Sequence, residues 1–359
     1  MKKRKKMIKT ILAICALTVC ACLFTACGSG NAPDGNTEND NVSQGSAAST
    51  GDSSGTANLK EVTLLLDWTP NANHAGIYAA QELGYYEDAG LKVNIQVPND
   101  STSTQLVGVG KAEFGISDTD SVLHAVSLDD PMPVKSIASI IQHNTSGFVS
   151  LKEEGIHSPK DWEGKTYGGF GGAAEEKIVR HIAEESGADP DSIRFIMLGN
   201  SDTLTSLQND IDFIWVFEAA ELLALDLAGV AYDYLPVRDY GETFDYYAPV
   251  LIANNNVCAQ DPEMVKAFLA ATSKGYEFAS EKPEEAADIL LKAAPELNED
   301  LIRKGLAYLS ERYAADAPQW GWQEADVWKR YADFLYKNEL IENEVEAGNV
   351  FTTEYLPES

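Results

Sequence analysis

Short apolar runs and alternating segments along the chain predict a series of β-strands. Residues 62–66, Val-Thr-Leu-Leu-Leu, form an almost continuous apolar run, which is typical of a strand buried on both faces. Residues 91–97 alternate apolar and polar positions with a period of two, which is typical of a strand with one buried face. The same signals predict further strands at 114–117, 134–141, 148–151, 166–170, 193–198, 213–217, 232–236 and 250–253.

Helical patterns fill most of the intervals between these strands and dominate the end of the chain. Residues 73–83 place apolar side chains on one helical face, and Gly84 follows as a helix stop signal. After Pro262 the pattern predicts helices at 263–280, 283–294, 298–312 and 323–338. Alternating strands and helices predict α/β lobes with largely parallel sheets, followed by a helical C-terminal part.

Two segments have the features of passages between separate lobes, one near 151–161 and the other near 246–253. We therefore expect a first lobe built from 59–153 and 250–359, which includes the C-terminal helices. A second lobe, 154–249, would be inserted between these two pieces. Two lobes joined by two passages can open and close on a ligand.

The N-terminus predicts an exported, lipid-anchored protein. Basic residues within 2–9 precede an apolar run, 11–24, which is shorter than the roughly 20 residues that a membrane-spanning helix needs. The run ends in Leu-Phe-Thr-Ala-Cys at 23–27, which resembles the lipobox of bacterial lipoproteins. The resemblance implies a signal peptide, 1–26, that is cleaved before Cys27, whose sulfur then carries lipid. A plain secretory signal with incidental cysteines is the alternative.

The next segment has the composition of a tether. Residues 28–58 consist mainly of Ser, Gly, Asn, Thr, Asp and Ala and contain almost no large apolar side chain. Such a composition is typical of a flexible linker, so we expect a lipid-anchored linker over 27–58. A globular body on a tether outside a membrane is either a capture device or a surface enzyme.

The charge balance excludes one large class of partners. Fifty-six Asp and Glu residues against 27 Lys and Arg give a formal net charge of −29, which repels phosphate backbones. Nucleic-acid binding is therefore excluded, and adhesion to anionic lipid is disfavoured. Hydrophobic residues make up 44% of the chain, which is enough for a sizeable core.

Cysteine and histidine positions predict neither a disulfide nor a metal site. Four of the five cysteines lie in the first 27 residues, and only Cys258 remains in the body of the chain. With Cys27 acylated, the mature chain can form no internal disulfide, and Cys258 is expected to be a small buried hydrophobe. The five histidines show no metal-ligand spacing.

Two glycine-rich matches to nucleotide-binding motifs fail on their context. Residues 169–174 fit G-x-G-x-x-A, but Asp189 precedes the next strand, whereas a ribose-binding acid should end it. Residues 108–111 lack the upstream glycine and the following Ser or Thr of a phosphate-binding loop. The chain has no G-x-S-x-G and no H-E-x-x-H motif. We therefore expect no catalytic residue and no cofactor.

The opening of the body carries a signature that is highly specific for a known family. Residues 67–78, Asp-Trp-Thr-Pro-Asn-Ala-Asn-His-Ala-Gly-Ile-Tyr, and residues 84–91, Gly-Tyr-Tyr-Glu-Asp-Ala-Gly-Leu, resemble the start of the NMT1/THI5-like family. Weaker matches extend the resemblance over 60–345, at 115–117, 158–161, 164–165, 169–177, 212–215, 320–322 and 327–328. The resemblance implies a type II periplasmic-binding-protein fold, in which two α/β lobes joined by two crossovers hold a ligand between them.

The resemblance leaves two functional classes. Synthase members of the family use a cysteine-rich run, a lysine-bound pyridoxal phosphate and a histidine, whereas other members bind solutes for import. This chain has no cysteine cluster and carries a lipobox, so we interpret it as a monomeric, lipid-anchored substrate-binding protein of an ABC importer. It would lie on the outer face of a bacterial cytoplasmic membrane, with a permease and its ATPase as partners. The resemblance favours a thiamine-precursor pyrimidine as ligand over riboflavin, another heteroaromatic or an anion.

An aminopyrimidine is flat and carries N–H groups at its edge, so a site for it needs aromatic walls and a carboxylate. Trp68 and Asn71 follow the first strand, at the carboxyl end where α/β sheets bind ligands, and His74 begins the next helix. Tyr86 and Asp118 complete this half of the candidate site. The alternatives are core packing for Trp68 and Tyr86, a turn for Asn71, and helix capping for His74 and Asp118.

The other half of the candidate site lies at the ends of two strands of the second lobe, and its members are Phe170, Gly171, Glu175, Glu176, Trp215 and Glu218. A bare helix N-terminus after the glycine turn would favour an anion. Glu175 and Glu176 oppose an anion there and offer a carboxylate, unless they only complement the helix dipole. Strand alternation lets Trp215 and Glu218 both face the ligand only if the strand ends before Glu218.

Overall fold

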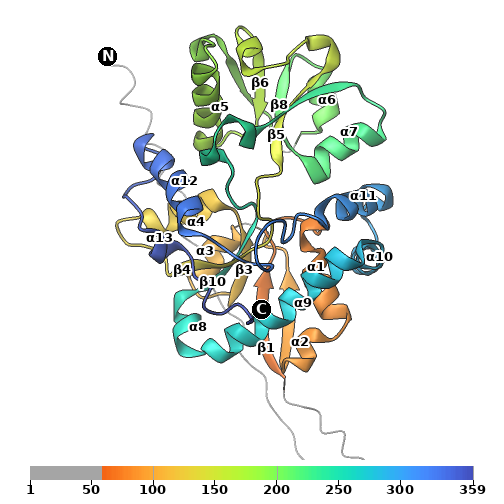
Figure 1. Cartoon of the computed structure of the whole chain (residues 1–359), viewed down its shortest axis with the longest axis vertical. Coiled ribbons are helices and arrows are strands. Elements are labelled where there is room, and N and C mark those ends of the chain that lie inside the picture. The colour runs from red at the N-terminus through yellow and green to blue at the C-terminus, as the bar shows by residue number, and fades with distance from the viewer. Residues whose placement is uncertain (1–58, 100, 200, 359) are drawn as a thin grey trace, which may run out of the picture. The chain divides into compact units, whose positions relative to one another are not determined.

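The computed structural model describes residues 59–358, apart from residues 100 and 200. The predicted signal peptide, lipobox and linker lie outside the described residues. Figure 1 shows helices packed around two separate β-sheets. Among the residues that the structure describes, no helix is long and apolar enough to cross a membrane.

The first sheet has five strands in the order β2-β1-β3-β10-β4. These strands are β1 (Lys60–Leu65), β2 (Leu91–Gln96), β3 (Phe114–Ser117), β4 (Val134–Ser139) and β10 (Val250–Asn254). Strand β1 pairs in parallel with β2 and β3, whereas β10 runs antiparallel to β3 and β4. The late strand β10 is therefore inserted between two early strands.

The second sheet has the order β7-β6-β8-β5-β9. Its strands are β5 (Ser146–Leu151), β6 (Thr166–Gly169), β7 (Arg194–Met197), β8 (Phe213–Phe217) and β9 (Tyr232–Pro236). Strand β6 is parallel to β7 and β8, whereas β5 is antiparallel to β8 and β9. Four of the five strands in each sheet therefore run in the same direction, which agrees with the prediction of largely parallel sheets. The sheets are mixed only because β5 and β10, which the chain enters from the other sheet, run in the opposite direction.

The chain passes between the sheets twice. Strand β5 pairs with β8 and β9, so the first passage is 140–145, and the predicted position near 151–161 was wrong. An apolar strand has the same pattern whichever sheet it joins, so the sequence could not show this. The second passage, 237–249, connects β9 to β10 and overlaps the predicted segment near 246–253.

Helices flank both sheets, and we call each sheet with its helices the first or second lobe. The longer helices are α1 (Ala75–Glu82), α4 (Thr119–Ser127), α5 (Ala173–Glu185), α9 (Pro262–Glu281), α10 (Pro283–Ala293), α11 (Glu299–Leu309) and α12 (Ala325–Lys337). The short ones are α2 (Tyr85–Asp88), α3 (Ser103–Gly108), α6 (Thr203–Leu207), α7 (Leu223–Leu227), α8 (Asn255–Gln260) and α13 (Ala347–Val350). Single helical turns are η1 (Ala72–His74), η2 (Lys152–Glu154), η3 (Pro159–Trp162), η4 (Pro190–Ser192), η5 (Glu218–Leu222), η6 (Val237–Tyr240) and η7 (Glu242–Phe244).

The core of the first lobe depends on a close crossing of α1 and α9. A Cβ atom on Gly275 of α9 would lie 2.0 Å from the carbonyl oxygen of Gly76 in α1, so only glycine allows this approach. Phe268 of α9 stacks on Phe114 of β3 with ring centroids 3.8 Å apart. The helix layer is thereby fixed on the sheet from whose strand ends the candidate site begins.

Aromatic side chains fill the core of the second lobe. Phe148 of β5 meets Trp162, Phe213 and Trp215 edge to face, with ring centroids between 4.8 and 6.3 Å apart. Trp162 also stacks on Phe213 at 4.8 Å. Such pairs give a defined packing that holds β8 and the turn after it in place.

Candidate functional site

Large apolar side chains are exposed at the carboxyl ends of strands in both sheets. They are 42% to 74% exposed and end or follow β1, β2, β6, β7 and β8: Trp68, Val97, Phe170, Met197 and Phe217. Helix α11 contacts both η1, which follows β1, and η5, which follows β8, so the ends of these strands lie near one helix. Exposed apolar groups at the carboxyl ends of α/β sheets indicate a ligand-binding edge.

A pocket of about 430 Å³ lies at the carboxyl ends of β1, β2 and β3. The segments that follow these three strands form its wall, which consists of 67–69, 97–99, 101–104, Ser117, Asp118 and Ser121. Trp68 and Asp118 are the two predicted site residues in this wall. One aromatic side chain among several hydroxyl and carboxylate groups suits a small polar ring.

A hydrogen-bonded turn presents Trp68 to this pocket. The Asn71 side chain caps η1 by accepting a hydrogen bond from the Asn73 N–H (2.9 Å). His74 is fully buried, its Nδ1 accepts from the Asn71 N–H (3.3 Å), and its Nε2 donates to Asp67 (2.8 Å). Both ring nitrogens of His74 are used inside the turn, so we interpret Asn71 and His74 as positioning residues for Trp68.

Of the other two predicted residues in this half of the site, Asp118 lines the pocket and Tyr86 does not. Tyr86 lies in the core of the first lobe, where its hydroxyl is 3.0 Å from Thr272 Oγ1 and its ring stacks on Phe268. We therefore leave Tyr86 out of the candidate site. Asp118 lines the pocket and at the same time caps α4, since its carboxylate accepts from the N–H and the hydroxyl of Ser121, both at 2.7 Å.

Asp120, in the first turn of α4, is a neighbour that the sequence interpretation did not single out as a ligand residue. Its carboxylate accepts a hydrogen bond from the Tyr331 hydroxyl of α12 (2.7 Å). Burial, together with the negative charge of Asp118, raises the pKa of Asp120 to about 7. The protonation of this carboxyl group therefore changes near neutral pH, in the same helical turn as the pocket residue Ser121.

Glu175 closes the turn after β6 with its own carboxylate. Its Oε1 accepts from the Tyr167 hydroxyl (2.5 Å) and the Phe170 N–H (3.1 Å), and its Oε2 accepts from the N–H groups of Gly171 (3.0 Å) and Gly172 (3.3 Å). Four donors occupy the four lone-pair positions of the carboxylate. We therefore interpret Glu175 as the residue that holds this turn, not as one with an acceptor available for a ligand.

The other predicted residues near this turn are Glu176, Phe170 and Gly171. Glu176 pairs with Arg180 one helical turn later (2.8 Å between Oε1 and Nε) and is about half exposed. Phe170 remains exposed beside Gly171, whose φ is 97°. A Cβ on Gly171 would lie 2.6 Å from Met197 Cε, but Met197 is 74% exposed and its side chain can move, so the positive φ is the reason that glycine is favoured here.

The end of β8 releases Glu218 from the strand's alternation and leaves Trp215 in the core. Trp215 is buried and meets Phe148 edge to face at 5.1 Å. Phe217 is exposed, and the π-helical turn η5 begins at Glu218. The strand thus ends before Glu218, which is the condition for this side chain to leave the strand's alternation.

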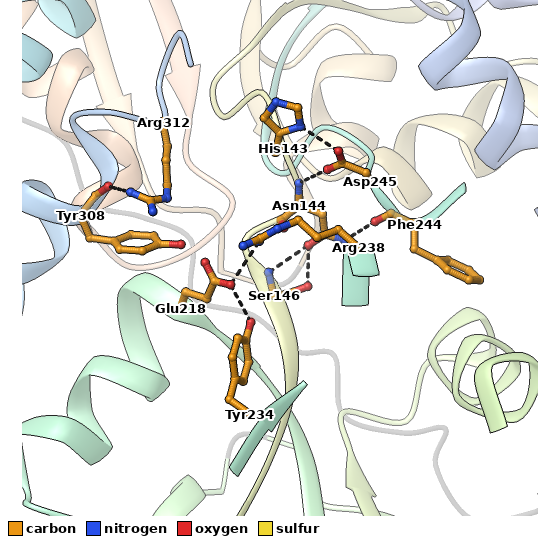
Figure 2. A network of polar contacts seen from close by, with 10 residues as sticks. All are labelled: His143, Asn144, Ser146, Glu218, Tyr234, Arg238, Phe244, Asp245, Tyr308 and Arg312. Carbon is orange, nitrogen blue, oxygen red and sulfur yellow. Dashed lines mark hydrogen bonds and ion pairs between the residues drawn. The ribbon is translucent and has the colours of Figure 1, made fainter. Parts of the chain in front are cut away.

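Glu218 is only 6% exposed and belongs to the hydrogen-bond network in Figure 2. Its Oε1 accepts from the Tyr234 hydroxyl (2.9 Å) and from Arg238 Nη1 (3.1 Å). Burial and the negative charge of Glu218 raise the pKa of Tyr234, so its hydroxyl stays protonated as a donor. The Oε2 of Glu218 is buried and has no hydrogen-bond partner among the described residues. An unpaired carboxylate oxygen of this kind has the chemistry to accept a hydrogen bond from an N–H group.

Polar groups of the two passages extend this network. Arg238 also donates to the Asn144 carbonyl (2.7 Å), and the Asn144 N–H donates to Asp245 (3.0 Å). His143 bridges Asp245 (2.8 Å) and Asp316 (3.0 Å). The hydrogen bond to Asp245, aided by Asp316, raises the pKa of His143 to about 9, so His143 is a cation at neutral pH.

The sequence interpretation included Glu218 but missed the other members of this network. The sequence feature that could have indicated them is the polar run at 142–146, Gln-His-Asn-Thr-Ser, which lies between two apolar strands. Polar groups between buried strands must find partners, so such a run indicates a segment with a polar role.

A family model for NMT1/THI5-like proteins matches residues 71–286. The chain belongs to the NMT1/THI5-like family. The formylaminopyrimidine-binding protein of Halalkalibacterium halodurans is 30% identical over 301 residues, which cover 82% of this chain and 90% of that protein. The 4-amino-5-hydroxymethyl-2-methylpyrimidine phosphate synthase of Legionella pneumophila is 31% identical over 310 residues, or 83% of this chain and 93% of that protein. The riboflavin-binding protein RibY of Chloroflexus aurantiacus is 23% identical and covers 83% and 87%.

Solved structures confirm the fold expected for an NMT1/THI5-like chain. The periplasmic aliphatic sulphonate binding protein SsuA from Escherichia coli aligns with a TM-score of 0.65 at 14% identity, over 84% of this chain and 94% of that one. The desulfurization enzyme DSZB aligns with a TM-score of 0.61 at 15% identity, over 82% and 97%. The fold is therefore of the type II periplasmic-binding-protein kind, and it serves both a binding protein and an enzyme.

The described part of this NMT1/THI5-like chain places few strongly nucleophilic or metal-binding side chains near the pocket. The described part of the chain holds no group of three or more His, Cys, Asp and Glu side chains placed for a metal ion. Cys258 is buried in the first lobe, and burial raises the pKa of its thiol to about 11. Neither lysine nor cysteine is among the described residues that line the pocket.

Proposed function

We propose that this chain is the substrate-binding component of an ABC importer and captures a small heteroaromatic ligand between its lobes. The observation that carries the proposal is a pair of groups at the ends of β1 and β8, namely the exposed indole of Trp68 and the buried Oε2 of Glu218. The indole offers a face for stacking, and the carboxylate oxygen accepts a charge-assisted hydrogen bond from an N–H. An aminopyrimidine supplies both the flat ring and the N–H.

The favoured ligand is a thiamine-precursor pyrimidine of the hydroxymethyl- or formylaminomethyl type. The relative named as a formylaminopyrimidine-binding protein supports this choice, because 82% of this chain aligns with it at 30% identity. Riboflavin is the alternative ligand, which the more distant relative RibY supports.

The turn after β6 weakens the case for an anionic ligand. In this fold the N–H groups before a helix are natural donors to an anion. Here the N–H groups of Phe170, Gly171 and Gly172 already donate to Glu175, which also brings a negative charge of its own. A sulfonate or a nitrate would have to displace this carboxylate.

A pyrimidine synthase is the alternative from another functional class, and the Legionella pneumophila relative supports it. The synthases of this family need a lysine for pyridoxal phosphate and a cysteine-rich run. The described wall of the pocket contains no lysine, and the only cysteine of the body is Cys258 in the first-lobe core. These residues do not fit the cofactor, so we propose a protein that catalyses no reaction.

The cellular setting follows from the N-terminal segment. We propose that the signal peptide, 1–26, is removed and that lipid on Cys27 anchors the chain through the linker 27–58. The lobes would then lie on the outer face of the cytoplasmic membrane as a monomer. The ligand would pass from them to a permease that a cytosolic ATPase drives.

A thermal-shift panel tests the proposed function. The purified protein is heated alone and with hydroxymethyl- and formylaminomethyl-pyrimidine, thiamine, riboflavin, taurine and nitrate. A ligand at 100 times its dissociation constant stabilises the folded state by about 2.7 kcal/mol, which raises the Tm by several degrees. We expect this shift with the pyrimidines only.

Other outcomes separate the alternatives. A shift with riboflavin alone would keep the transport role and replace the ligand. A shift with taurine or nitrate alone would contradict both the ligand and the closed Glu175 turn. Absorbance of bound pyridoxal phosphate together with release of a pyrimidine product would establish the synthase and overturn the proposal.

A further inference from the structure

Two buried polar atoms without partners lie on opposite sides of the contact between the lobes. One is Oε2 of Glu218 in the second lobe, and the other is the hydroxyl of Tyr308 on helix α11. Neither atom has a hydrogen-bond partner among the described residues. Figure 2 shows the ring of Tyr308 reaching from its helix toward the Glu218 carboxylate. A buried polar group without a partner is costly, so two of them at one place indicate a functional demand.

Helix α11 is held so that it presents Tyr308 at this place. The Tyr313 hydroxyl donates to the Ala72 carbonyl in η1 (2.7 Å), which ties the end of α11 to the first lobe. A Cβ on Gly305 would lie 3.1 Å from the Ala219 carbonyl oxygen in η5 and 3.3 Å from Ala72 Cβ. The helix therefore lies closely between η1 and η5, and Tyr308, three residues after Gly305, lies on the same face.

Arg312 orients the Tyr308 ring. Its guanidinium carbon lies 3.6 Å from the ring centroid, which is a close cation–π contact. The same guanidinium donates to the Tyr308 backbone carbonyl, so both ends of the contact are fixed. Arg238 pairs with Oε1 of Glu218 at 3.1 Å, which leaves Oε2 as the oxygen without a partner among the described residues.

We propose that α11 is the third wall of the ligand site and that Tyr308 is a ligand-binding, specificity-determining residue. This inference rests on the proposed function and narrows its ligand class. Glu218 Oε2 can only accept a hydrogen bond, whereas the Tyr308 hydroxyl can donate one. Together they fit a ring edge with an N–H beside an acceptor nitrogen, which is the edge of a 4-aminopyrimidine. The carboxylate takes the amine N–H, and the hydroxyl donates to the adjacent ring nitrogen.

The test is Tyr308→Phe, which removes only the hydroxyl. Affinity is measured by titration calorimetry with 4-amino-5-hydroxymethyl-2-methylpyrimidine and with the same ring without its 4-amino group. We expect the dissociation constant for the amino compound to rise about tenfold, which corresponds to about 1.4 kcal/mol. The preference of the protein for the amino compound should shrink in the variant. The ligand-free Tm should stay the same or rise, because the variant no longer buries an unpaired hydroxyl.

The matched control is Tyr232→Phe, whose hydroxyl donates to Asp226 (2.8 Å) on the surface of the second lobe. This variant should leave affinity unchanged. For Tyr308→Phe, unchanged affinity would overturn the inference, because the hydroxyl would then make no contact with the ligand. A lowered ligand-free Tm would also overturn it, because the hydroxyl would then have a hydrogen-bond partner within the protein. If the wild-type protein binds neither pyrimidine, the proposed ligand is refuted, and this result does not depend on Tyr308. The ligand-free Tm of Tyr308→Phe then still decides, since a rise supports an unpaired hydroxyl at a binding edge and a fall refutes it.

Discussion

Glu175 and Glu176 are neighbours in the first turn of α5, and replacing each by glutamine should have very different effects. Glu175→Gln keeps the size of the side chain but replaces one carboxylate oxygen by an NH₂ group. That group would face N–H donors of the turn, which now donate to Glu175 at 3.0 Å from Gly171 and 3.3 Å from Gly172. Glu176→Gln loses only a half-exposed pair with Arg180.

The expected magnitudes follow from these contacts. The two glycine residues are exposed, so water replaces the lost acceptor at small cost, but two bonds to Oε1, from the buried Tyr167 hydroxyl and from the Phe170 N–H, lose their charge assistance. Charged hydrogen bonds contribute about 1 kcal/mol more than neutral ones, so Glu175→Gln should lower the free energy of unfolding by about 2 kcal/mol. Glu176→Gln should lower it by about 0.3–0.5 kcal/mol, the value of an exposed helix pair.

Urea unfolding followed by fluorescence measures both variants, and calorimetry measures their ligand affinity. We expect Glu175→Gln also to weaken binding several-fold, because the turn carries Phe170, whereas Glu176→Gln should bind like the wild type. Equal stability losses in the two variants would refute the assignment of Glu175 as the residue that closes the turn. A large loss of affinity in Glu176→Gln would restore the earlier expectation that this carboxylate contacts the ligand.

Three further predictions concern the pocket and the passages. Trp68→Ala should weaken ligand binding about tenfold or more with little effect on the Tm, because the indole is 53% exposed, whereas Tyr336→Ala at a similar exposure should leave binding unchanged. Equal effects of these two variants would contradict the stacking role. The His143 pKa is raised from 6.5 to about 9, so its stabilisation is complete below about pH 6.5 and is lost as the pH rises through about 9. This part of the Tm profile should vanish in His143→Gln, and an identical profile would refute it. The Asp120 pKa is raised from 3.8 to about 7, so its stabilisation is complete below about pH 3.8 and is lost as the pH rises to about 7, and Asp120→Asn should raise the Tm at pH 8 but not at pH 4. A fall of the Tm at pH 8 would show that the charge is needed.

The sequence predicted the elements of the fold far better than their connections. Each of the ten strands overlaps a predicted one, because short apolar runs bounded by turn residues are a local signal. The sheet that β5 joins is not local information, since Phe148 and Val149 would suit either core. The first passage was therefore placed several residues too late.

The candidate site was predicted where chemistry depends on strand ends and was missed where it depends on partners. The exposure of Trp68 and the burial of Glu218 follow from their places after β1 and β8. That Glu175 is occupied by its own turn depends on where four donors lie in space, which no spacing rule gives. Tyr308 follows a helical pattern typical of packing, and only its hydroxyl, which has no partner among the described residues, indicates the binding role that we propose.

The bonds around Asn144 have a mechanical consequence for the two passages. Asn144 of the first passage accepts from Arg238 and donates to Phe244 and Asp245, all three of which belong to the second passage. The two chain segments are thereby joined side by side into one ribbon, so neither can twist while the other stays still. A rotation of one lobe against the other must bend both together about a common axis. We therefore expect the lobes to open and close about one hinge axis that runs through both passages, and we expect a ligand to be released only when this hinge bends.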